Sequence, residues 1–112
     1  MKMKTLPSQK ERKRYVFFTV RSNARLSFEE AKDAINNSLL CWMGNSNYAK
    51  ARPWVIKNMW EKDSGVIQCT HRYVDDVKLS LALIRQIGDA KVIFHTKRVS
   101  GTIKSGKEKL GS

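Results

Sequence analysis

Apolar and polar or aromatic residues alternate along residues 14–21, and this period of two predicts a first β-strand. In that strand Val16, Phe18 and Val20 line one face, and Tyr15, Phe17 and Thr19 line the other. A turn at residues 22–23 ends the strand. The stretch therefore predicts a strand with one strongly apolar face, which needs a covering layer.

The hydrophobic period becomes helical after Ser27. Ser27 and Glu30 have the spacing of a capping box, so we expect a helix over residues 27–43. Gly44 is expected to end it in a left-handed cap, and residues 49–52 to form a short basic connector. The predicted core face of the helix consists of Phe28, Ala31, Ile35, Leu39 and Trp42.

Two more strands are predicted after Pro53, which suits the start of an edge strand because it has no backbone N–H. The first covers residues 54–60, with Trp54, Ile56 and Trp60 on a shared side. A polar hairpin loop at residues 61–65 leads to the next strand at residues 66–70.

A second helix is predicted over residues 72–87, with acidic residues in its first turn and Gly88 after its end. Its core stripe consists of Val74, Val77, Leu81 and Ile84. Leu79, Ala82 and Leu83 add apolar surface beyond that stripe, which favours a contact with a partner protein. A last buried strand is predicted around residues 92–94.

The order strand, helix, strand, strand, helix, strand is typical of an α+β, ferredoxin-like or RNA-recognition-motif-like βαββαβ sandwich. We expect a four-stranded antiparallel sheet over residues 14–100, with two helices on one face and the other face open. Residues 1–13 form a basic N-terminal arm and residues 101–112 a basic C-terminal tail. The third strand lacks the aromatic residues that stack bases in RNA-recognition motifs, and the first strand offers only Phe17 or Phe18.

The charge of the chain indicates that this predicted domain binds a partner. Its 112 residues include 22 Lys and Arg against 10 Asp and Glu, a formal net charge of +12. Residues 1–14 carry a net charge of +5 and residues 96–112 a net charge of +4, so nine of the twelve excess charges lie at the two ends. A surface that is merely basic would scatter its charges. The clustering favours a polyanionic partner, with nucleic acid first.

Other chemistries find little support in the residues. Cys69, His71, Cys41 and His95 are types that bind zinc, but no paired Cys-x-x-Cys spacing arranges them, so buried cysteines in a reducing cytosol are the simpler interpretation. No apolar run has the length of a membrane span, and no signal peptide precedes the domain. No phosphate-binding glycine loop, nucleophile elbow or carboxylate cluster is visible. We expect no catalytic residues, no bound metal and a cytoplasmic protein.

Six stretches resemble the archaeal ribonuclease P protein component 2 family, the subunits related to the eukaryotic Pop-five protein. They are residues 4–7 (KTLP), 13–15 (KRY), 26–30 (LSFEE), 49–57 (AKARPWVIK), 80–84 (SLALI) and 99–104 (VSGTIK). They are distributed in order over nearly the whole chain, and the AKARPW and VSGTIK runs are the specific ones. The resemblance implies an RNA-binding, non-catalytic subunit of an endoribonuclease whose RNA carries the chemistry with Mg²⁺ and removes the 5′ leader of precursor tRNA.

The same resemblance implies the partners. They are the ribonuclease P RNA, precursor tRNA and the barrel-type component 3, with two copies of each protein in a heterotetramer. Leu79 and Leu83 are the predicted protein contacts. The predicted phosphate contacts are Arg12, Lys13, Arg14, Arg52, Lys57, Lys97, Arg98, Lys104, Lys107 and Lys109. Two alternatives stay open, a stand-alone or ribosomal RNA-binding module and a small metal-dependent nuclease or nucleotide-binding enzyme of ferredoxin-like fold.

Overall fold

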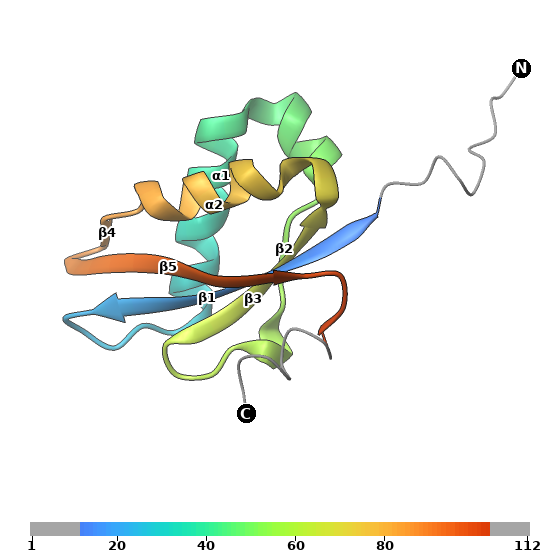
Figure 1. Ribbon diagram of the computed structural model, residues 1–112. Helices are drawn as coiled ribbons and strands as arrows, with labels where there is room; N and C mark the ends of the chain where they lie inside the picture. Colours follow the sequence, from blue (N-terminus) through green and yellow to red (C-terminus); the bar gives the residue numbers. More distant parts are fainter. Residues whose placement is uncertain (1–11, 104–112) are drawn as a thin grey trace, which may run out of the picture.

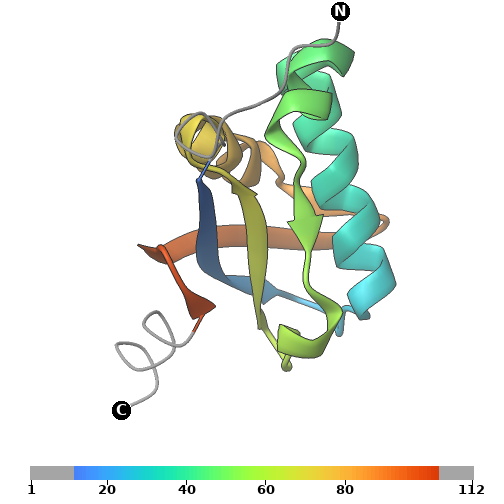
Figure 2. The ribbon, with the colours of Figure 1, turned by 90° about the vertical axis from the view of Figure 1, so that its right-hand side faces the viewer.

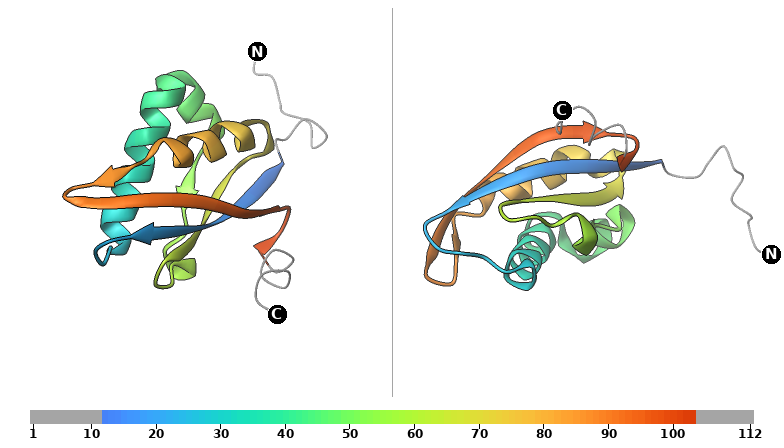
Figure 3. Two further views of the ribbon diagram at one scale, coloured as in Figure 1. Left: turned by 60° about the vertical axis from the view of Figure 1, so that its left-hand side comes forward. Right: turned by 90° about the horizontal axis from the view of Figure 1, so that it is seen from below.

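The computed structural model describes residues 12–103 as a curled, five-stranded antiparallel sheet with two helices on one face (Figure 1). The elements in chain order are β1 (Lys13–Ser22), α1 (Phe28–Ala51), β2 (Trp54–Val55), η2 (Lys57–Met59), β3 (Ser64–Thr70), η3 (His71–Tyr73), α2 (Val74–Leu83), β4 (Gln86–Ile87) and β5 (Ala90–Ser100). The strands lie in the order β2-β3-β1-β5-β4, and all neighbouring pairs are antiparallel. Seen from the side, α1 and α2 form one layer and the sheet the other (Figures 2 and 3).

The sheet has five strands rather than the four expected from the sequence. The predicted second helix ends early, at Leu83, and the residues that follow form β4 instead of its last turns. Gly88 is therefore not a helix stop. It has φ +59° and, with Asp89, makes the two-residue turn between β4 and β5, a conformation that glycine adopts at no steric cost.

The first helix is longer than predicted. Gly44 does leave the helical conformation, with φ +81° and ψ 165°, but the helix resumes and continues to Ala51, which is fully buried. Across the break, Asn47 Nδ2 donates to the Met43 carbonyl at 3.2 Å. Residues 49–51 are thus the last turn of α1 rather than a connector, and Arg52 caps it in the left-handed conformation (φ 48°).

The predicted second strand was also too long. Only Trp54–Val55 pairs with β3, as an edge strand after Pro53, and residues 57–59 turn into a 3₁₀-helix. Trp54 does not share a packed side with Trp60, because its side chain is 64% exposed. Trp60 instead packs between Phe18 and Phe28, with ring centroids 6.4 Å and 6.2 Å away.

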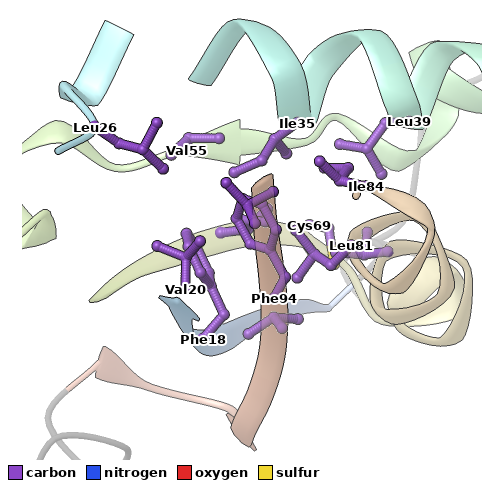
Figure 4. Packing of buried hydrophobic residues seen from close by; sticks show 14 of the residues in the cluster. Phe18, Val20, Leu26, Ile35, Leu39, Val55, Cys69, Leu81, Ile84 and Phe94 are labelled. Carbon is purple, nitrogen blue, oxygen red and sulfur yellow. The ribbon is translucent and has the colours of Figure 1, made fainter. Parts of the chain in front are cut away.

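The core lies between the sheet and the helix layer (Figure 4). Val16, Phe18 and Val20 of β1 meet Ile35 and Leu39 of α1, as the two periodicities predicted. The stripe of α2 is largely confirmed, since Val77, Leu81 and Ile84 are buried and Val74 is partly buried. Two core assignments were wrong. Trp42 is 48% exposed, with Met43 buried in its place, and Ile93 of β5 is 55% exposed.

Candidate RNA interface on the open sheet face

The face of the sheet that points away from both helices is called the open face here. Directly paired residues of antiparallel strands share a face, so the register assigns its members. They are Lys13, Tyr15, Phe17, Thr19 and Arg21 of β1, Ser64, Val66 and Gln68 of β3, Trp54 of β2, and Lys91, Ile93, His95, Arg98 and Ser100 of β5.

The strand residues of the open face include four cations, Lys13, Arg21, Lys91 and Arg98, and no acid. One acid borders the face at the turn before β3, where Glu61 pairs with Ser64. The other acids within residues 12–103 are in the helices (Glu29, Glu30, Asp33, Asp75 and Asp76) or in turns (Asp63 and Asp89). None of the four open-face cations forms an ion pair with another residue of the described range. Fixed positive charges without acidic partners are available to phosphates.

A β-bulge places Arg98 on this face. Phe17 pairs with Arg98 while Phe18 pairs with Thr96, which leaves Lys97 as an extra residue of β5 with no residue opposite it. Before the bulge, Val92 and Phe94 point toward the helices; beyond it, Val99 packs on the core. In a regular strand Lys97 would lie opposite Phe17, and the alternation would have turned Arg98 toward the core. The Nε atom of Arg98 is buried and has no hydrogen-bond partner within residues 12–103.

The predicted RNA contacts fall into two groups around this face. Arg12, Lys13, Arg14, Lys97 and Arg98 lie where the start of β1 runs beside the end of β5. Arg14 donates through Nη1 to the Lys13 carbonyl at 3.0 Å, and the Arg12 carbonyl accepts from the His71 amide at 2.7 Å. Arg52 and Lys57 are exposed and flank β2 at the sheet edge. Lys104, Lys107 and Lys109 lie outside the described residues.

Sequence reasoning missed Arg21, Lys91 and Trp54 as members of this face, whereas it correctly grouped Tyr15 with Phe17 and Thr19. The alternation of β1 carried the signal for Arg21, since residue 21 continues the series of Tyr15, Phe17 and Thr19. Trp54 had no such signal, because its face depends on pairing with a distant strand. The two aromatic residues that had been considered are both buried, Phe17 at 4% and Phe18 at 1% exposure, so neither is an accessible platform.

The predicted protein contacts Leu79 and Leu83 are exposed on α2, at 41% and 52%. They are one helical turn apart on one stripe, three and seven residues after Asp76. Asp76 Oδ1 accepts a hydrogen bond from the Trp42 indole at 3.1 Å, which fixes Trp42 beside this stripe. Trp42, Leu79 and Leu83 are called the helix-layer patch below.

The described residues contain no cluster of the side chains that bind metals. No group of three or more His, Cys, Asp or Glu side chains lies close enough to hold a metal within residues 12–103. Cys69 is buried in the core while Cys41 is exposed, so the four zinc-type residues are not assembled. Burial raises the pKa of the Cys69 thiol from 9.0 to about 11, the opposite of what a nucleophile or metal ligand needs. No helix in this range is long and apolar enough to cross a membrane.

A hollow of about 670 Å³ lies at one end of the sheet, where the loop after β1 meets the turn before β3. Arg25, Lys62 and Asp63 contribute charges of both signs to its lining, and Trp60 forms part of its wall. This mixture distinguishes it from the open face, whose charged strand residues are all cations.

An α+β domain with its helices on one side of the sheet and a predominantly cationic face on the other is thus the class of protein that the structure defines. The chain belongs to the Rpp14/Pop5 family, whose family model matches residues 14–111. This confirms the family that the six sequence stretches indicated.

The curated relatives agree with this assignment. Proteins named ribonuclease P protein component 2 are similar to this chain from Pyrococcus furiosus (41% identity, covering 96% of this chain and 90% of that protein) and from Methanocaldococcus jannaschii (34%, covering 96% and 80%). The relative from Thermococcus kodakarensis is 32% identical and covers 93% of this chain and 87% of that protein. These relatives are ribonuclease P protein subunits, as predicted.

The fold is also found in a solved assembly. A chain of the yeast ribonuclease MRP structure superposes with a TM-score of 0.64, covering 82% of this chain and 76% of that chain. At 12% sequence identity this likeness concerns the fold alone.

Proposed function

We propose that this chain is the RNA-binding protein subunit of a ribonuclease P, and that it supports a catalytic RNA in removing the 5′ leader of precursor tRNA. Family membership supports a role in a ribonuclease P assembly, and the cationic open face is the observation that supports RNA binding. Its cations offset phosphate repulsion where RNA strands approach one another, and phosphate contacts position a protein without reading sequence.

In this proposal the RNA and its Mg²⁺ ions perform the hydrolysis. A bound metal can activate the attacking water and stabilise the leaving oxygen in phosphodiester hydrolysis. Residues 12–103 contain no group of three or more His, Cys, Asp or Glu side chains that could hold such a metal. The contribution of this chain is then the shape and charge of the surface against which the RNA folds.

The helix-layer patch is the proposed contact with a second protein, the barrel-type component 3, in a heterotetramer with two copies of each. Exposed Trp42, Leu79 and Leu83 form an apolar surface on a layer that also carries most of the acids. Burying side chains of this size against a partner is favourable because each removes apolar area from water. RNA and protein would thus occupy opposite faces of one domain.

We also infer that the sheet is the ferredoxin-like plan with one strand added. The order β2-β3-β1-β5, with helices after β1 and β3, reproduces that plan, and β4 extends it at the β5 edge. The β4–β5 hairpin covers an edge that would otherwise be free on β5.

Reconstitution tests the proposed function. The chain alone should leave precursor tRNA uncut, whereas adding it together with component 3 to ribonuclease P RNA should raise the cleavage rate at moderate Mg²⁺. Sequencing the RNA that co-purifies with the chain provides an independent measurement. Recovery of ribosomal RNA in place of ribonuclease P RNA would favour the stand-alone module, and cleavage by the RNA-free protein would favour the nuclease alternative.

A further inference from the structure

The pairing register of β1, β2 and β3 places three side chains in a row that no local sequence pattern predicts. Trp54 of β2 pairs with Gln68 of β3, and Gln68 pairs on its other side with Tyr15 of β1. Trp54, Gln68 and Tyr15 therefore lie side by side on the open face, and we call them the aromatic row. With strands about 4.8 Å apart, its two aromatic residues are separated by roughly 10 Å.

The aromatic row is accessible, in contrast to the aromatic residues of the core. The Trp54 side chain is 64% exposed, and Tyr15 is partly exposed. Neither the Tyr15 hydroxyl nor the Gln68 amide has a hydrogen-bond partner within residues 12–103. An exposed tryptophan beside a free amide has both a face for stacking and groups for hydrogen bonding.

Cations border the aromatic row near Trp54 and beside Tyr15, whereas the next row of the face also carries the apolar residues Phe17 and Val66. Arg52 and Lys57 flank Trp54 along the chain, and Lys13 lies two residues before Tyr15 on the same face. Beyond Tyr15, the next position of the row is Ser100 of β5, followed in the adjacent row by Arg98. Among the described residues, the nearest acids in sequence to Gln68 and Trp54 are Asp63 and Glu61, in the turn before β3, where Glu61 pairs with Ser64.

We propose that the aromatic row binds two unpaired RNA nucleotides, one base stacked on Trp54 and the next on Tyr15, with Gln68 between them. Two bases held roughly 10 Å apart cannot remain stacked on each other or paired in a helix, so the row selects single-stranded RNA. The surrounding cations hold the connecting phosphates. This inference rests on the proposed function and adds to it the class of RNA that the open face takes.

The charged residues around the aromatic row favour RNA over a protein as its binding partner. A protein partner suits the helix-layer patch, where leucines stand beside Asp75 and Asp76. The aromatic row has no acid and no exposed aliphatic side chain in it, and cations border it. Aromatic platforms edged by cations are the arrangement with which proteins bind single strands irrespective of sequence.

The experiment compares two exposed tryptophans on opposite faces. Binding of the full chain to labelled eight-nucleotide oligouridylate and oligoadenylate, and to an RNA hairpin without unpaired stem bases, is measured for wild type, Trp54→Ala and Trp42→Ala. Loss of one stacked base should lower the affinity of Trp54→Ala for the single strands about fivefold to a hundredfold, while hairpin affinity changes by less than about twofold. Trp42→Ala should bind all three RNAs as wild type does.

Two further measurements separate stacking from charge and from folding. The salt dependence of binding should keep its slope in Trp54→Ala, because no cation has been removed. Trp54→Phe should regain most of the affinity, and Tyr15→Ala should weaken single-strand binding in the same manner as Trp54→Ala. Melting curves check that each variant is folded, which is expected for Trp54 because its side chain is mostly in solvent.

Equal single-strand affinity for Trp54→Ala and wild type would overturn the inference while leaving the proposed function intact, provided that both bind the hairpin. The inference would also be overturned if Trp54→Ala kept its RNA affinity but no longer bound component 3, because the aromatic row would then be a protein contact. A wild-type chain that binds none of the three RNAs would overturn the proposed function itself.

Discussion

Phe18 lies directly across from Gly65, and its ring occupies the space that a side chain at Gly65 would need. The two residues pair between β1 and β3, and an added Cβ would come within 2.8 Å of Phe18 Cζ and 3.0 Å of Trp60 Cε3. Phe18 in turn contacts Phe94 at a centroid distance of 5.6 Å. The glycine is thus required by the aromatic packing of the core, although the sequence suggested a loop glycine.

Gly65→Ala should therefore destabilise the domain by about 1 to 3 kcal/mol, because Phe18 and Trp60 are both held in a packed core and cannot move away freely. Urea or thermal unfolding measures the change. Gly101→Ala is the matched control, since its added Cβ would meet only Arg14 Nη1, at 3.7 Å. Equal stability of Gly65→Ala and wild type would show that the ring accommodates the methyl group.

Cys69 should make the stability fall at alkaline pH. Burial raises the pKa of its thiol from 9.0 to about 11, so between these values the unfolded chain releases a proton that the folded chain retains. The contribution is fully present below pH 9 and is lost as the pH rises toward 11, at up to about 1.4 kcal/mol per pH unit.

The measurement is urea unfolding between pH 8 and 11 for wild type and Cys69→Ala, in which the alkaline decline should be shallower. Thiol labelling gives a second test, because Cys41 is exposed and Cys69 is 1% exposed. A thiol reagent should modify one cysteine in the folded protein and both after unfolding. Parallel pH profiles for the two proteins would show that Cys69 is not the source of the decline.

The cations at the end of β5 and in the C-terminal tail should contribute salt-dependent RNA affinity. Replacing Lys97, Arg98, Lys104, Lys107 and Lys109 by Gln removes up to five phosphate contacts, so the slope of log affinity against log salt should become shallower by about three or four units. The loss should be similar for unrelated structured RNAs, because phosphate contacts carry no sequence information.

Salt titrations of the five-Gln variant and wild type measure this effect, with melting curves to verify folding. A variant with Lys32→Gln, Lys50→Gln and Lys78→Gln, all on the helices, is the control for a general loss of charge. An unchanged slope for the five-Gln variant would indicate that other cations of the open face, such as Lys13 and Arg21, make the phosphate contacts.

Leu83→Asp should abolish binding to component 3 without unfolding the chain. The Leu83 side chain is 52% exposed, so its replacement costs the monomer little, whereas a carboxylate in an apolar interface is strongly unfavourable. Pull-down with purified component 3 measures binding. Leu81→Asp is the contrasting variant, since Leu81 is 1% exposed and a charge there should unfold the domain. A large fall in the melting temperature of Leu83→Asp would show that this residue supports the fold.

Local patterns in the sequence determined the parts of this protein that depend on neighbours along the chain. The capping box at the start of α1 is present as predicted, with Ser27 Oγ accepting from the Glu30 amide at 3.1 Å and Glu30 Oε1 accepting from the Ser27 amide at 3.0 Å. The alternation of β1 correctly placed Val16, Phe18 and Val20 in the core. These features are recognisable because a helix cap and a strand face are set within a few residues.

Only the tertiary structure decided which side chains meet on the open face. The bulge at Lys97, which turns Arg98 outward, arises from the pairing of β5 with β1, more than 70 residues earlier in the chain. Trp54 and Tyr15 become neighbours because both pair with Gln68, and β4 exists because its residues pair with β5 rather than continuing α2. Strand register is an interaction between distant segments, and a shift of one residue reverses every side chain, so no local pattern fixes it.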